Sequence, residues 1–299
     1  MASLVSQGER VPKTLKLFIG GEFPRTESGR SFPVYDQDSK KVFAQLCQAS
    51  RKDFRNAIAA SLKACEQWQQ RTAYNRAQIL YRMAEMTEGH REDMVSVLKS
   101  TSGVNAQTAE NSIDQVVDAF VYYAGFCDKY SQLSGCVNPV NGPHHAFTTP
   151  EPVGCVVCLF DDDMGAAAAL PLVASTLASI ITSGSVVTAL LPTAAAAQIA
   201  SLGEIFATSD LPKGVVNLLT GNRSELIDYM ASHMEVQSVC YVGSDRAVKE
   251  KLKTLGAENM KRVVWRELHA NAADTNENLR LENILSFVEY KTVWHPVGN

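Results

Sequence analysis

The sequence predicts an α/β protein built on a doubly wound parallel sheet. Between residues 153 and 268, five short apolar runs alternate with segments of helical length and spacing. Apolar runs of this kind are typical of strands buried on both faces, and their alternation with helices favours parallel pairing. The five runs are VGCVVCLF, SVVTALL, VVNLLT, VQSVCYVG and KRVVWREL.

The segments on either side of this region predict a mixed periphery. Residues 17–50 alternate apolar and polar positions around turn signals, which indicates short strands. Helical spacing predicts helices over 51–68, 75–100 and about 106–132. A connector rich in glycine, proline and asparagine then leads to a strand that ends near residue 154. At the other end, a polar stretch precedes a short helix and a last strand.

Composition and charge exclude several classes of protein. The formal net charge of −4 gives no basic surface for nucleic acid or an anionic membrane. The most apolar stretch, 164–191, is interrupted by Pro171, Thr176 and a turn at 182–184, so it predicts a buried helix and strand rather than a membrane span. Residues 1–16 form a polar leader without a signal-peptide core. Seven irregularly spaced cysteines indicate free thiols, and we expect a cytoplasmic protein.

The sequence contains three clusters of metal-ligating residue types, and none predicts a metal site. Cys155 and Cys158 lie three apart on an expected strand, so their side chains face opposite ways, and the same holds for the adjacent His144 and His145. The acidic run 161–163 ends the first strand of the sheet, where ligands bind in α/β proteins. Clustered carboxylates of this kind can hold a cation. The favoured interpretation is that they are solvent-exposed acids at the start of a helix, where the helix dipole favours negative charge.

Several motifs resemble the aldehyde dehydrogenase superfamily. They are EPVG, LPKGVVNLLTG, ASHMEVQSVCYVGS and KRVVWREL, together with LFIGGEF near the start and FVEYKTVWHP near the end. The resemblance implies N-terminal strands and helices at 17–136, a bridging arm at 137–152, a Rossmann-like cofactor domain at 153–268 and an oligomerisation tail at 282–299.

The resemblance also implies that the catalytic domain is absent. In the superfamily this domain, with its nucleophilic cysteine, lies between the sheet strand that ends here at Leu268 and the terminal strand. Only 31 residues follow Leu268 and none is cysteine, while the last cysteine, Cys240, lies in an expected buried strand. We therefore expect no catalytic residue and a linker at 269–281 in place of the domain. The pattern is most similar to the truncated C-terminal module of family-16 aldehyde dehydrogenases, which implies the C-terminal half of a longer chain.

The cofactor side departs from the superfamily pattern as well. The resemblance implies a lysine in a Lys-Pro-Ser turn after the second strand, but Leu191 precedes Pro192 here, and no lysine or arginine occurs between Lys129 and Lys213. Pro192, Gly221, Gly243, Ser244 and, with one inserted residue, Glu267 remain as vestigial cofactor-binding candidates. Glycines at such turns are also wanted for geometry alone, which is the favoured interpretation. We expect no NAD(P) binding, or weak binding.

The acidic run also coincides with the superfamily's oxyanion-stabilising asparagine. One alignment places Asp163 at that position and another places Ala167 there, and neither side chain donates a hydrogen bond when the aspartate is ionised.

The resulting hypothesis is a non-catalytic aldehyde dehydrogenase-like module that serves assembly. Its terminal strand pairs with a protein partner, either its own copy in a dimer or another aldehyde dehydrogenase-like module, and Trp294 is an interface anchor. The alternative hypothesis is an NAD(P)-binding module that regulates or supports an active assembly.

Overall fold

A five-stranded parallel sheet forms the centre of the molecule. The computed structural model describes residues 12–266 and 280–298. Every pair of neighbouring strands is parallel, which confirms the predicted fold class. The strand order is β10 (Arg262–Arg266), β9 (Ser238–Val242), β6 (Cys155–Phe160), β7 (Val186–Leu190) and β8 (Val216–Leu219).

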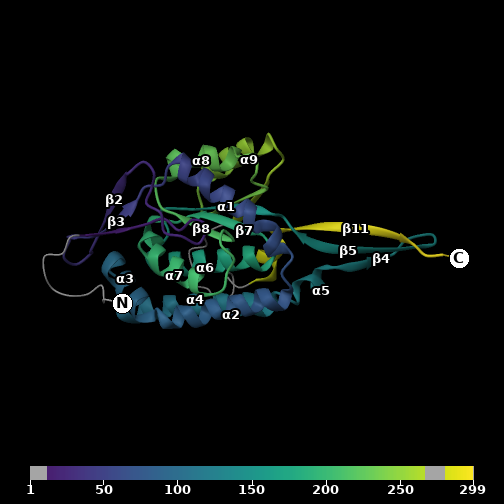
Figure 1. Ribbon diagram of the computed structural model, residues 1–299, viewed down its shortest axis with the longest axis horizontal. Coiled ribbons are helices and arrows are strands. Elements are labelled where there is room, and N and C mark those ends of the chain that lie inside the picture. Colours follow the sequence, from purple (N-terminus) through teal and green to yellow (C-terminus); the bar gives the residue numbers. More distant parts are fainter. Residues whose placement is uncertain (1–11, 267–279, 299) are drawn as a thin grey trace.

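Helices cover both faces of this sheet. One face carries α1 (Arg51–Gln69), α8 (Arg223–Ser232) and α9 (Arg246–Ala257) (Figure 1). The other face carries α6 (Ala166–Thr182) and α7 (Ile199–Thr208), which follows the short 3₁₀ helix η1 (Thr193–Gln198). A further layer packs outside α6 and consists of α2 (Ala73–Gly89), α3 (Arg91–Ser102) and α4 (Ala106–Phe126). No helix in the described ranges has the length and hydropathy needed to cross a membrane.

Two of the predicted helices are divided. The helix expected over 75–100 ends at Gly89 and restarts at Arg91, because His90, at φ −102° and ψ 5°, leaves the helical conformation. The glycine that precedes this break has a low helix propensity. The helix expected over 106–132 ends at Phe126, and the chain turns before the short α5 (Tyr130–Ser134).

The N-terminal strands form a small sheet of their own. Its order is β1 (Lys13–Leu15), β3 (Val42–Cys47) and β2 (Ser31–Tyr35). Strand β1 falls inside the stretch 1–16 that we expected to be a leader, so that boundary was wrong. The reason is packing, since Leu15 is buried and β1 pairs in parallel with β3.

A third sheet projects from the body as an arm (Figure 1). It contains β4 (Cys136–Asn138), β5 (His144–Pro152) and β11 (Val288–Pro296), in the antiparallel order β11, β5, β4. The short helix α11 (Leu281–Leu285) leads into β11 and packs against α6. His144 and His145 lie on opposite faces, as predicted, since the first contacts Trp294 and the second contacts Phe147.

Candidate functional site at the carboxyl end of the sheet

The topology of the central sheet marks one edge as the candidate site. From β6 the chain adds β7 and then β8 on one side, whereas β9 and β10 lie on the other side. The connections therefore diverge between β6 and β9, and such a switch point opens a crevice at the carboxyl ends of the strands. Asp161 and Asp162 follow β6 at this edge, and Gly243 and Ser244 follow β9.

The Asp161 carboxylate lies at this switch point and is bound by neighbouring groups. Its Oδ1 atom accepts a hydrogen bond from the Arg223 guanidinium at 2.9 Å. Its Oδ2 atom accepts from the Tyr241 hydroxyl at 3.1 Å and from the Ser244 backbone N–H at 3.3 Å. Asp161 is only 7% exposed. The carboxylate therefore binds a cation, a hydroxyl and the N–H just before α9, as an anionic ligand would.

The ionisation of this cluster follows from its contacts. Burial by itself raises the pKa of Asp161, but hydrogen bonds from Arg223, Ser244 and Tyr241 outweigh it, so the pKa lies below its ordinary value. Burial and the neighbouring Asp161 charge raise the pKa of Tyr241 to about 12. At neutral pH the cluster is a carboxylate held by a guanidinium, with Tyr241 as a neutral donor.

Asp162 occupies the neighbouring turn in the same way. Its Oδ1 atom accepts from the Thr193 hydroxyl at 3.0 Å and from the Thr193 backbone N–H at 3.4 Å. Thr193 is the first residue of η1 and directly follows Pro192, which ends the turn after β7. Two consecutive aspartates thus bind backbone donors at the carboxyl ends of two different strands.

The glycine candidates have steric roles in these turns. A Cβ atom on Gly243 would lie 2.5 Å from Cζ of the Tyr241 ring. Gly221 has φ +153°, and a Cβ atom there would lie 3.1 Å from the backbone nitrogen of Ala49. The helix that follows Gly221 is already capped, because Asn222 Oδ1 accepts from the Ser224 N–H at 2.9 Å. Glu267 lies outside the described residues.

Comparison with known proteins places the chain in a family. The sequence model of the aldehyde dehydrogenase family matches residues 23–273. The chain belongs to this family. Mitochondrial benzaldehyde dehydrogenase of Antirrhinum majus is 30% identical over 83% of this chain and 46% of its own length. Cytosolic 10-formyltetrahydrofolate dehydrogenase of Xenopus laevis is 27% identical over 83% of this chain and 28% of its own length.

Solved structures of the family give the same picture. A point mutant of an aldehyde dehydrogenase from Bacillus cereus superposes with a TM-score of 0.76 at 25% identity, over 85% of this chain and 51% of that one. The chain therefore spans about half the length of the family structures that it matches.

The residues at the switch point do not fit the phosphates of a nicotinamide dinucleotide, the cofactor that the family resemblance implies. Such phosphates require free N–H donors or cations at this edge. In the described part of the chain, the Ser244 and Thr193 N–H groups bind carboxylates, and Leu191 stands where the family pattern has lysine. An incoming phosphate would meet two negative side chains, so no cofactor step is assigned to this edge.

Sequence reasoning missed the central contact of the site. The acidic run was expected to be solvated, and this expectation was wrong for Asp161, whose carboxylate pairs with Arg223. The Arg223 side chain is 18% exposed and reaches from α8 to the end of β6. The available signal was that opposite charges follow two strands of one sheet, β6 and β8, whose carboxyl ends meet at one edge.

The cysteines are free thiols, and three of the buried ones have raised pKa values. All seven lie in the described ranges, and Cys240 is fully buried in β9, as predicted. Burial raises the pKa of Cys127 to about 11 and that of Cys155 to about 12, and it also raises the pKa of Cys158. No cluster of three or more histidine, cysteine, aspartate or glutamate side chains in the described residues is arranged to hold a metal ion.

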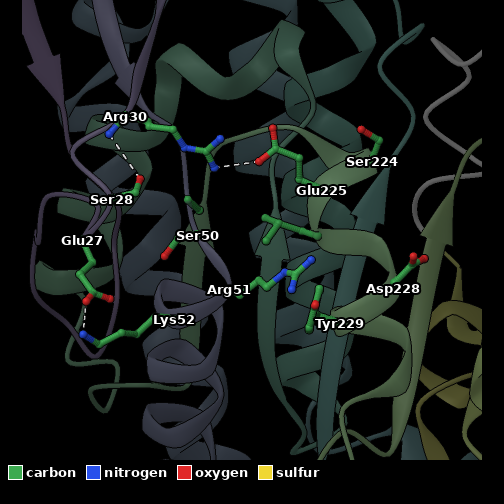
Figure 2. Close-up of a pocket in the computed structure, with 12 residues that line it drawn as sticks. Glu27, Ser28, Arg30, Ser50, Arg51, Lys52, Ser224, Glu225, Asp228 and Tyr229 are labelled. Atoms are coloured by element: carbon green, nitrogen blue, oxygen red, sulfur yellow. Dashed lines mark hydrogen bonds and ion pairs between the residues drawn. The ribbon is translucent and has the colours of Figure 1, made fainter.

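A cavity of about 570 Å³ lies away from this edge, between the starts of α1 and α8 and beside the loop before β2. Figure 2 shows Arg30 reaching across it to Glu225 at 2.7 Å, and Gln48 donates to the other oxygen of the same carboxylate. The Arg51 guanidinium lies 3.6 Å from the centre of the Tyr229 ring, a cation–π contact. These contacts tie α8 to the N-terminal segment.

Proposed function

We propose that this chain is a non-catalytic aldehyde dehydrogenase-like module that assembles with a protein partner through its arm. The observation that carries the proposal is β11, a nine-residue strand at the outer edge of the projecting sheet. All of its residues after Val288 are exposed. An exposed edge of this length presents unpaired backbone groups, which natural proteins either protect or use for strand addition.

The site geometry supports the non-catalytic part of the proposal. Covalent aldehyde chemistry needs an activated nucleophile with a base in reach. The thiols of Cys127 and Cys155 have raised pKa values, and at the switch point the Asp161 carboxylate already accepts hydrogen bonds from Arg223, Tyr241 and Ser244. We extend the proposal to a module of a longer two-module protein, similar to the C-terminal unit of family-16 aldehyde dehydrogenases, that acts in the cytoplasm.

Sedimentation of the full chain beside a chain that ends at Val288 tests the assembly role. The shortened chain keeps the buried Phe287 and Val288 and loses only exposed residues of β11. We expect the full chain to assemble and the shortened chain to remain a monomer. An identical assembly state for both would contradict docking through the arm.

Calorimetry with NAD and NADP tests the non-catalytic role. We expect no binding up to millimolar cofactor, because the two turns are occupied by carboxylates. The matched variant is Leu191→Lys with Asp162→Ala, which places a cation at the family position and removes the acceptor that binds the Thr193 donors. Micromolar binding by the unaltered chain would instead support the alternative, a cofactor-binding regulatory module.

A further inference from the structure

The backbone of β11 has a defined open edge. Strand β11 pairs with β5 in one register, from Val288 opposite Pro152 to Pro296 opposite His144. At the two ends of this ladder, Val153 donates to the Phe287 carbonyl and Val297 donates to the Pro143 carbonyl. In an antiparallel pair only every second residue bonds to its neighbour. Odd-numbered residues of β11 therefore direct their N–H and C=O groups to β5. Even-numbered residues direct these groups to the open edge.

At each end of this edge, one backbone hydrogen-bonding group is already bound or is absent. The Arg262 guanidinium donates to the Val288 carbonyl, so the acceptor nearest the body already has a donor. At the far end, Pro296 has no N–H to donate. Between them, Tyr290, Thr292 and Trp294 each present one N–H and one C=O group outward.

We propose that this edge pairs with the same edge of a second copy of the chain, antiparallel and centred on Thr292. The inference rests on the proposed assembly function and names its partner. The two arms then join into one six-stranded antiparallel sheet with the two bodies at opposite ends. Such a contact is isologous, because each copy contributes the same strand.

Backbone complementarity selects this register. Centring on Thr292 sets Tyr290 opposite Trp294 of the second copy, so three N–H groups from each chain find acceptors. It also sets Pro296 of the second copy, which lacks an N–H, opposite Val288, whose carbonyl Arg262 already binds. Centring on Trp294 would leave the Thr292 carbonyl opposite Pro296, without a donor. Centring on Tyr290 would direct a Thr292 N–H to the occupied Val288 carbonyl.

The side chains agree with the same register. Tyr290 and Trp294 are 53% and 59% exposed and lie on one face of the sheet. Pairing about Thr292 places Tyr290 beside Trp294 of the second copy, and Trp294 beside Tyr290 of the second copy. Cross-strand aromatic pairs of this kind stabilise a sheet. On the opposite face Glu289 meets His295, and Lys291 meets Val293, so no like charges are opposed. Centring on Lys291 would set two lysines against each other.

A disulfide reports the register directly. Opposed residues at a hydrogen-bonded antiparallel pair have Cα atoms about 5.5 Å apart, within the range that a disulfide spans. We expect Thr292→Cys, in a Cys136→Ser background, to form a covalent dimer under mild oxidation. The matched control is Val137→Cys in the same background, because Val137 is 67% exposed on the other edge of the arm. Equal dimer yields from both variants, or none from Thr292→Cys, would overturn the inference.

Thr292→Pro tests the open edge and keeps the backbone hydrogen bonds to β5, since the Thr292 N–H faces outward. It also removes the hydrogen bond between the Thr292 and Thr148 hydroxyls, which Thr148→Ala removes without altering β11. We expect sedimentation to show that the dissociation constant of the dimer rises at least about tenfold, because two of six central hydrogen bonds are lost. Thr149→Ala, on β5 of the same arm, should leave the dissociation constant of the dimer unchanged. One result would contradict this register and still support the proposed function. In that result the dimer is lost on truncation at Val288, but Thr292→Cys does not cross-link it. A full chain that is monomeric at tens of micromolar would overturn self-pairing.

Discussion

Asp161 acts within the chain as an anionic ligand acts at the end of a parallel sheet. Its carboxylate lies where two strand connections diverge and binds Arg223, Tyr241 and the Ser244 N–H. Both charged groups are largely buried, with side chains 18% exposed for Arg223 and 9% for Asp161. A buried pair of this kind is costly to break, because the partner left behind keeps an uncompensated charge.

Neutralising Asp161 should therefore destabilise the fold. We expect Asp161→Asn to lower the free energy of unfolding by about 2–3 kcal/mol, since charge-assisted hydrogen bonds are lost and Arg223 stays buried. Urea unfolding at pH 7 measures the difference. The exposed neighbour Asp163 provides the control, and Asp163→Asn should change stability by less than about 0.5 kcal/mol. Equal effects from both substitutions would show that the buried pair contributes nothing specific.

The same carboxylate predicts a dependence on pH. The pKa of Asp161 is lower in the folded chain than in the unfolded chain. Its contribution is thus fully present above the unfolded pKa, about 3.9, and is lost as pH falls through the lower folded value. Urea midpoints measured from pH 7 down to pH 3 should fall less steeply at the acid end for Asp161→Asn than for the unaltered chain. Parallel profiles would contradict this assignment.

At the scale of elements, the turn between β9 and α9 is fixed by close packing. Gly243 lies against the Tyr241 ring, donates to the Arg266 carbonyl at 3.0 Å and accepts from the Trp265 indole at 2.7 Å. Asp245 then caps α9 by accepting from Ala247 and Val248. These contacts place the turn independently of any bound ligand.

Gly243→Ala tests the steric role of this turn. A methyl group 2.5 Å from the Tyr241 ring forces the ring or the backbone to move, which should cost about 1–3 kcal/mol. Gly89→Ala is the matched control, because a Cβ atom there meets nothing within 4 Å. Differential scanning calorimetry without ligand should show a lower Tm for Gly243→Ala and an equal or higher Tm for Gly89→Ala. An unchanged Tm for Gly243→Ala would contradict a steric role.

At the scale of the molecule, the chain consists of a layered body and an arm. The body shares one core that runs from the N-terminal strands to Phe287 and Val288, where the tail enters the arm. Beyond Val288 the last strand contributes no buried side chain. Folding of the body and the proposed assembly through the arm therefore depend on different residues.

Two truncations should separate these roles. A chain that ends at Val288 should unfold within a few degrees of the full chain, because it loses only exposed residues. A chain that ends at Asn283 also loses the fully buried Ile284, Phe287 and Val288, each worth about 1.5–3 kcal/mol. Its Tm should fall by many degrees in thermal denaturation followed by circular dichroism. Similar Tm values for the two truncated chains would contradict the division at Val288.

Much of the fold was predictable because its signals are local. Five apolar runs alternating with helical segments determine a parallel α/β sheet, since each strand must be buried on both faces. The helix break at His90 and the strand at 13–15 were not predictable from periodicity, because a single residue and a three-residue pairing decide them.

The sequence by itself determined the fold class, the family motifs and the loss of the lysine before Pro192. Only the tertiary structure decided what the acidic run does. Asp161 and Arg223 are 62 residues apart and meet because β6 and β8 end at the same edge of the sheet. The open edge of β11 was decided in the same way, since the β5 register determines which backbone groups face outward. Pairing across long sequence separations leaves no local pattern, which is why the structure was needed.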